Sequence, residues 1–143
     1  MHSGERLAGS ILLTFFGAAC SSAPSSPSPG IPADQLLGTW SLVSLQPARE
    51  PEQPTAAGAL YTLTFGSGNE YSTRAECTAC SGTFALTGST LSTGPVRLCA
   101  SVNCQEMAFE SRYKMLLTGD STVALSTTAL QLSSARGVLR FTR

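Results

Sequence analysis

Cysteines are the residues of this chain with the widest range of possible chemistry. Besides Cys20, they form a CxxC pair, Cys77 and Cys80, and a CxxxxC pair, Cys99 and Cys104. Four thiolates can hold a structural zinc ion, but the irregular second spacing and an oxidising compartment disfavour zinc here. A redox-active CxxC lies at the start of a helix, whereas the residues after Cys80 predict a strand. An even set of cysteines in an exported chain instead predicts two disulfides.

A predicted hairpin selects among the possible disulfide pairings. Strands at 82–87 and 90–98 fold back on each other, so that residues just before the first strand lie opposite residues just after the second. A crossed pairing would twist this hairpin against its register. We therefore predict two nested disulfides, Cys80–Cys99 and Cys77–Cys104.

Groups that could catalyse a reaction are sparse. The single histidine, His2, lies in the leader sequence and is lost on export, which excludes a Ser-His-Asp triad and a His-ligated zinc from the mature protein. Ser111 and Lys114 match the SxxK motif of penicillin-binding proteins, yet neither SDN nor KTG occurs in the chain. A solvated helix face explains this pair more simply. We predict no catalytic residues, no enzyme activity, no cofactor and no metal site.

The N-terminus predicts export and lipid anchoring. An uncharged run from Leu7 to Ala19 follows a single arginine and is too short for a membrane-spanning helix, which needs about 20 apolar residues. Small residues lie directly before Cys20, as in the lipobox of bacterial lipoproteins, although Gly17 replaces the usual leucine. We therefore predict a signal peptide at 1–19 and lipid attachment at Cys20. The alternative is a plain signal peptide that leaves Cys20 as an odd thiol.

Composition divides the remaining chain into a tether and one domain. Residues 20–35 carry the anchor and a stretch of Ser, Pro, Ala and Gly that stays extended. Residues 36–143 are predicted to form a single domain. Acidic and basic residues balance to a net charge of +0 without charge runs, so no nucleic-acid partner is expected. By analogy with bacterial lipoproteins, we expect attachment to the outer membrane of the cell envelope on its periplasmic side, and an envelope protein as partner.

The domain sequence is typical of an antiparallel β protein. Short segments rich in Thr, Leu, Val, Phe and Tyr are separated by Gly, Ser and Asn turns. The predicted strands lie near 38–45, 59–65, 70–76, 82–87, 90–98, 121–126, 128–133 and 137–142. The predicted fold class is α+β, a mostly antiparallel, partly open β-barrel or sheet of about eight strands with one amphipathic helix between strands five and six.

The helix is predicted from residues 104–119. Phe109 and Tyr113 belong to an apolar stripe at helical spacing. Glu110 and Lys114 are four positions apart on another face, where they can form an ion pair. The glycine that closes the segment can end the helix in the left-handed conformation. This amphipathic helix must lay its apolar stripe on the sheet.

An ordered set of motifs covers residues 36–142. It comprises a GxW strand, a cysteine before an SGxF strand, a GxxLxxGP hairpin, a second cysteine, a helix and closing strands. The residues that carry these motifs are Gly38-Thr39-Trp40, Cys77, Ser81-Gly82-Thr83-Phe84, Gly88, Leu91, Gly94-Pro95, Cys104 and Tyr113. The set resembles the META domain family, that of the heat-shock lipoprotein HslJ.

The resemblance implies a small α+β domain, often exported and lipid-anchored, in a family linked to heat shock, novobiocin resistance and, in some parasites, virulence. It implies no reaction and no catalytic residues. Cys77 and Cys104 occupy the two cysteine positions of the family, which also favours the nested pairing.

Two functions are expected. The first is a non-catalytic envelope lipoprotein that binds a protein partner or supports the envelope under stress. The alternative is a lipocalin-like carrier of a small apolar ligand, because Gly38 and Trp40 on the first strand and Arg140 on the last resemble the residues that close the barrel base in lipocalins. Against the carrier, a single tryptophan is more commonly a core residue.

Overall fold

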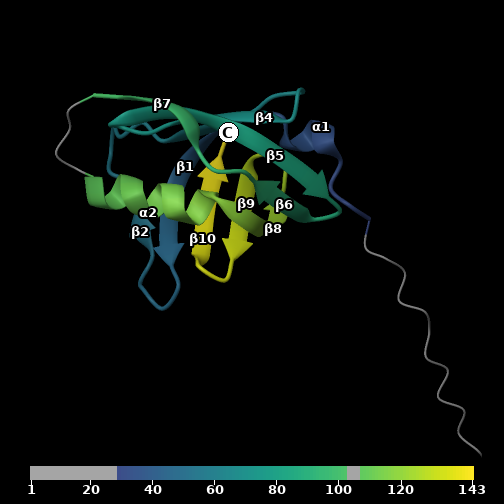
Figure 1. Cartoon of the computed structure of the whole chain (residues 1–143). Coiled ribbons are helices and arrows are strands. Elements are labelled where there is room, and N and C mark those ends of the chain that lie inside the picture. The colour runs from purple at the N-terminus through teal and green to yellow at the C-terminus, as the bar shows by residue number, and fades with distance from the viewer. Residues whose placement is uncertain (1–28, 103–106) are drawn as a thin grey trace, which may run out of the picture.

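The computed structural model describes residues 29–102 and 107–143, and its main feature is a closed antiparallel β-barrel (Figure 1). Its elements are α1 (Ala33–Leu36), β1 (Gly38–Pro47), β2 (Gln53–Pro54), β3 (Thr62–Phe65), β4 (Glu70–Arg74), β5 (Thr78–Thr87), β6 (Thr90–Thr93), β7 (Arg97–Ser101), α2 (Met107–Leu117), β8 (Gly119–Leu125), β9 (Ala129–Ser134) and β10 (Gly137–Thr142). The barrel strands follow the order β10-β9-β8-β6-β5-β4-β3-β1, and pairing of β10 with β1 closes the ring. Outside the ring, β2 pairs with β1 and β7 pairs with β5. The predicted class, mostly antiparallel β with one longer helix, is confirmed.

One predicted strand is divided in the structure. The segment predicted as a strand at 90–98 forms β6 and the start of β7. Between them, the Gly94 N–H donates to the Thr83 carbonyl at 2.8 Å, and Pro95 has no N–H with which to continue a ladder. β6 then pairs with β8, whereas β7 returns to pair with β5. Helix α2 follows β7 and precedes β8, at the place predicted for it.

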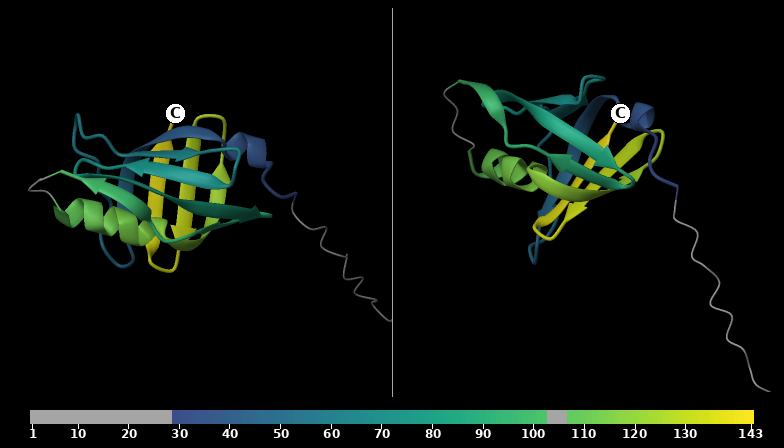
Figure 2. Two further views of the ribbon diagram at one scale, coloured as in Figure 1. Left: turned by 45° about the horizontal axis from the view of Figure 1, so that its top comes forward. Right: turned by 45° about the vertical axis from the view of Figure 1, so that its right-hand side comes forward.

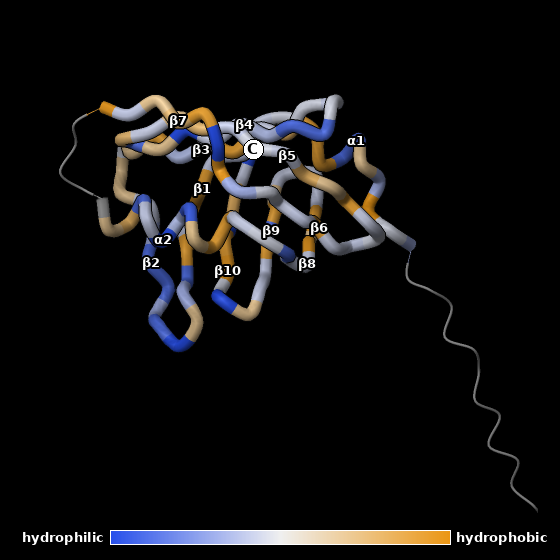
Figure 3. Tube along the Cα trace, viewed as in Figure 1, coloured by the Kyte–Doolittle hydropathy of each residue, from blue (hydrophilic) through white to orange (hydrophobic). Residues whose placement is uncertain are grey.

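Side chains of the protein fill the barrel. Inward and outward residues alternate along the strands, as in β10, where Leu139 and Phe141 are buried and Val138 and Arg140 are partly exposed. The largest side chains that are almost fully buried are Trp40, Tyr71, Tyr113, Phe65, Leu36, Leu45, Leu63, Leu91, Leu117, Leu130, Leu132 and Leu139. Figure 3 shows apolar and polar residues interspersed along the strands of the barrel. Because each buried side chain of this size contributes about 1.5–3 kcal/mol, this interior is the main source of stability.

A bulge interrupts the alternation of β1. The register with β10 shifts between Leu42 and Ser44, and Val43 is 48% exposed. Leu42 and Leu45 are both buried although they are three positions apart. The extra residue therefore keeps apolar side chains inward on both sides of the bulge.

Helix α2 packs against β1 and β10 with one face buried (Figure 2). Tyr113 and Leu117 are at most 1% exposed. The Tyr113 ring packs edge-on against Tyr61 and Phe141, at centroid distances of 5.5 and 6.4 Å. After the helix, Gly119 adopts a φ of 98°, which favours glycine, and the chain continues as β8. The apolar stripe of α2 thus completes the core.

Gly82 of the SGxF motif makes room for a buried tyrosine. A Cβ at this position would lie 2.6 Å from Tyr71 ring atoms. Tyr71 is 1% exposed and donates a hydrogen bond from its hydroxyl to the Gly94 carbonyl at 2.9 Å. The Tyr71 ring therefore links the SGxF and GP motifs, and it fits in this place because Gly82 has no side chain.

Candidate functional site

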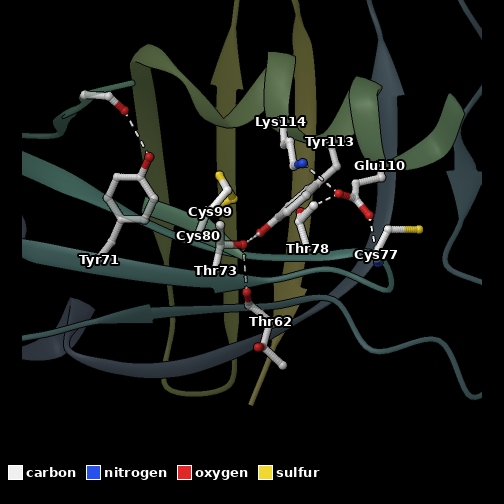
Figure 4. The surroundings of a disulfide bond; sticks show 11 residues. Thr62, Tyr71, Thr73, Cys77, Thr78, Cys80, Cys99, Glu110, Tyr113 and Lys114 are labelled. Atoms are coloured by element: carbon white, nitrogen blue, oxygen red, sulfur yellow. Dashed lines mark hydrogen bonds and ion pairs between the residues drawn. A yellow bond between two sulfur atoms is a disulfide. The ribbon is translucent and has the colours of Figure 1, made fainter. Parts of the chain in front are cut away.

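The cysteine-bearing edge of the sheet is formed by the start of β5 and by β7 (Figure 4). A disulfide joins Cys80, which is buried, to Cys99, which is exposed. Cys77 is also disulfide-bonded. Its predicted partner Cys104 and the predicted lipid attachment site Cys20 lie outside the described residues. The Cys77–Cys104 pairing therefore stays a prediction.

A buried carboxylate fastens α2 to the start of β5 (Figure 4). Glu110 is 1% exposed, and its carboxylate accepts hydrogen bonds from the Cys77 N–H at 2.9 Å and from the Thr78 hydroxyl. The Lys114 ammonium lies 2.6 Å from the same carboxylate. Burial raises the pKa of Glu110, but the bonds from Lys114, Thr78 and Cys77 together outweigh it, so that the net pKa is below the ordinary value. Glu110 is therefore an ionised structural group rather than a proton donor.

A chain of hydroxyl groups connects α2 to β4 and β3 (Figure 4). The Thr73 hydroxyl donates to the Thr62 carbonyl at 2.9 Å, so that its oxygen is left to accept the proton of the Tyr113 hydroxyl at 2.7 Å. Burial raises the pKa of Tyr113 despite the hydrogen bond with Thr73. This tyrosine therefore stays neutral and serves as a buried donor.

An arginine from the end of the chain covers Trp40 of the first strand, but it is Arg143 and not the expected Arg140. The Trp40 indole N–H donates to the Leu36 carbonyl at 2.9 Å, and the Arg143 guanidinium carbon lies 4.2 Å from the centroid of the Trp40 ring. Arg140, the residue expected there, points elsewhere and lies 3.2 Å from the Glu52 carboxylate. The alternation of β10 explains this correction, because Arg140 is on the outer face whereas Arg143 follows the end of the strand.

The SxxK pair does not form a serine–lysine site. Ser111 is exposed, and the Lys114 ammonium is engaged by Glu110 at 2.6 Å. Within residues 29–102 and 107–143, no three His, Cys, Asp or Glu side chains are grouped so that they could hold a metal ion. In the same part of the chain, no helix has both the length and the apolar character needed to cross a membrane.

Strand β7 is exposed along its whole length. All five of its residues, RLCAS, are exposed, and among the strands of residues 29–102 and 107–143 it pairs with β5 alone. Leu98 is 89% exposed, and Val102, which follows the strand, is 68% exposed. Two open surface depressions, of about 200 and 370 Å³, include residues of β5 and β7 in their walls. This surface was not predicted, because the second strand of the hairpin was expected to end at residue 98.

Comparisons with known proteins agree with this fold. Residues 34–143 match the sequence model described as the META domain. No curated protein sequence matches the chain. A protein from Burkholderia xenovorans has a similar structure, with a TM-score of 0.62, 24% identity, and coverage of 87% of this chain and 95% of that one.

Two proteins from Bacteroides also have similar structures. A lipocalin-like protein from Bacteroides uniformis gives a TM-score of 0.56 at 20% identity, and covers 76% of this chain and 98% of its own. An uncharacterized protein from Bacteroides eggerthii gives a TM-score of 0.52 at 14% identity, with the same coverage. At these identities, the likeness shows a shared fold alone.

Proposed function

Because this chain belongs to the META domain family, we propose that it is a non-catalytic, lipid-anchored binding protein of the bacterial cell envelope. The observation that carries binding is strand β7, whose five residues are all exposed and which is held to β5 by the Cys80–Cys99 disulfide. The acidic and tyrosine side chains of the polar cluster, Glu110 and Tyr113, are occupied by structural contacts. Binding of another molecule at the protein surface is therefore the function that this fold supports best.

The anchor is supported by the sequence before the domain. The uncharged run that ends in small residues before Cys20 is the pattern of a lipoprotein signal peptide. Acylation at Cys20 would hold the domain at the outer membrane on its periplasmic side. A protein of the envelope is then the partner within reach, and the balanced charge of the chain gives no attraction for nucleic acid.

Intact mass spectrometry of the full chain extracted from its native membrane tests this proposal. We expect a chain that begins at Cys20, carries added acyl mass and gains the mass of two reduced disulfides when treated with reductant. The variant Cys20→Ala should lose the acyl mass and leave the membrane fraction. A wild-type chain without acyl mass, recovered in the soluble fraction, would refute the anchor.

The role under envelope stress needs a separate test. Cells that lack the protein should survive heat or novobiocin less well than cells that make it, and the wild-type gene should restore survival. The Cys20→Ala variant should restore survival poorly if the role is exerted at the membrane. Equal survival of all strains would refute a protective role.

A carrier of a small apolar ligand is the second candidate. It is favoured by the lipocalin-like neighbour and by the contact of Arg143 with Trp40 across the first and last strands. The filled interior opposes it, because Tyr113 and the leucines around it occupy the space that a ligand would need. Denaturing extraction of the purified protein should release no lipid, and apolar dyes should not bind. Recovery of a stoichiometric apolar molecule would reverse this ranking.

A further inference from the structure

The outer edge of β7 is unpaired in the described part of the chain. On the inner side, the Val102 N–H donates to the Cys77 carbonyl at 2.9 Å, and Ala100 is the register partner of Ala79. Because hydrogen-bonding directions alternate along an antiparallel strand, the N–H and C=O of Ser101 point away from β5. Unpaired backbone groups of this kind are a template for another strand.

The features that usually protect an edge strand are confined to one end of β7. Arg97 supplies a charge, and Leu98, with a φ of 50°, lies at the irregularity in the β5–β7 register. The other end, from Ala100 to Val102, has neither a charge nor a proline. This end carries an exposed apolar side chain instead, since Val102 is 68% exposed.

We propose that β7 pairs with β7 of a second copy of this chain, antiparallel about a two-fold axis at Ala100. In this register, Leu98 lies opposite Val102 of the second copy, and by symmetry the contact occurs twice. These are the two most exposed large apolar side chains of the described residues. Ala100 lies opposite its own copy in a non-hydrogen-bonded pair, where the strands approach most closely and a small side chain fits.

Charge and rigidity favour a second copy as the occupant. A chain with a net charge of +0 does not repel its own copies. The two Arg97 side chains lie on opposite sides of the axis, about 20 Å apart along the strands, and do not face each other. The Cys80–Cys99 disulfide holds β7 on β5 before association, which reduces the entropy lost when the strands pair.

This interface deepens the binding part of the proposed function, on which it rests, because it assigns a second copy of this chain as the envelope protein that binds β7. Two strands of five residues bury a small area, so the dimer belongs among the weak and reversible associations. Concentration on a membrane would favour it further. If the chain proves to be monomeric, the proposal of an anchored protein that binds another envelope protein still stands. If the chain proves to be unacylated, the proposed dimer still stands.

Sedimentation equilibrium of the full chain in density-matched detergent, over a wide concentration range, tests the dimer. Leu98→Lys should weaken association by about tenfold or more, because symmetry removes the contact twice. Val43→Lys is the matched control, since Val43 is also exposed, at 48%, and lies on β1, which pairs with β10, β2 and β3 rather than with β7. A chain that stays monomeric at every concentration, or a dimer that Leu98→Lys leaves unchanged, overturns the proposal.

Cross-linking tests the register itself. Ala100→Cys places a thiol on the two-fold axis, so mild oxidation should yield a covalent dimer. Ser72→Cys, on the exposed side of β4, should remain monomeric under the same conditions. Far-ultraviolet circular dichroism and Trp40 fluorescence confirm that each variant is folded. If Ala100→Cys and Ser72→Cys cross-link to the same small extent, the pairing at Ala100 is refuted.

Discussion

The contact between Glu110 and the start of β5 yields the sharpest stability prediction. Hydrogen bonds to a charged group each contribute about 1.5–3 kcal/mol. Glu110→Gln retains an oxygen that can accept from Cys77 or Thr78, but it removes the negative charge beside Lys114. We expect it to lower the free energy of unfolding by about 2–3 kcal/mol at pH 7. Glu110→Ala removes the acceptor for buried donors as well and should cost about 3–5 kcal/mol.

The same residue predicts a pH dependence. Folding lowers the pKa of Glu110 below its ordinary value of 4.5, so the unfolded chain binds this proton more tightly than the folded protein does. The stabilisation is therefore complete above about pH 4.5 and is lost as the pH falls through the lower folded pKa. The difference in unfolding free energy between wild type and Glu110→Gln should shrink over this acidic range.

Urea unfolding followed by Trp40 fluorescence measures both effects. The single tryptophan is 0% exposed, so its emission reports the loss of the core. Glu76→Gln is the matched control, because Glu76 is close in sequence to Cys77 but exposed. If Glu110→Gln costs no more than Glu76→Gln and retains the wild-type acid sensitivity, the carboxylate does not hold α2 in place.

Three further predictions concern other contacts. Gly82→Ala should lower the free energy of unfolding by about 1–3 kcal/mol, measured by thermal unfolding, because the new Cβ would overlap the buried Tyr71 ring. Gly68→Ala is the control and should change the free energy of unfolding little, because no atom lies within 4 Å of its new Cβ. Arg143→Ala should lower stability by about 1 kcal/mol and shift the tryptophan emission to longer wavelength, because the ring loses its cover; unchanged emission would contradict this. Replacing both cysteines of the Cys80–Cys99 disulfide by alanine should cost up to about 3 kcal/mol in urea unfolding, the value for closing a loop of 19 positions in an otherwise open chain, and less if the predicted Cys77–Cys104 bond already restricts the same segment; an unchanged free energy of unfolding would contradict this.

The strands and the helix could be predicted because their side chains repeat at the spacing of the backbone. Alternation in β3 and β10 and the spacing of Phe109 and Tyr113 in α2 reflect which face is buried. The split between β6 and β7 was not predicted, since it depends on the tertiary contact of Gly94 with Thr83. β2 was missed because two paired residues are too few to give a pattern.

The burial of Glu110 was missed for a different reason. Glu110 and Lys114 were predicted to form an ion pair on a face apart from the apolar stripe, because residues four positions apart are neighbours on a helix surface. The spacing contains a signal, however, since Glu110, Tyr113 and Leu117 are three and four positions apart and share one helix face. What the sequence could not supply was the partner, which lies on β5, far along the chain.

Closure of the barrel by β1 and β10 determines when the protein can finish folding. Ser41 pairs with Thr142, so the ring requires contact between strands from opposite ends of the domain. Such distant contacts slow folding, because the entropy of closing a long loop is lost before the contact forms. A chain synthesised or translocated from its N-terminus must therefore keep the β10 side of β1 unpaired until the last strand arrives. During that interval the incomplete barrel exposes apolar side chains and an unpaired strand edge, both of which promote aggregation. Whether the chain avoids aggregation therefore depends on the rate of its synthesis or translocation as well as on the stability of the folded protein.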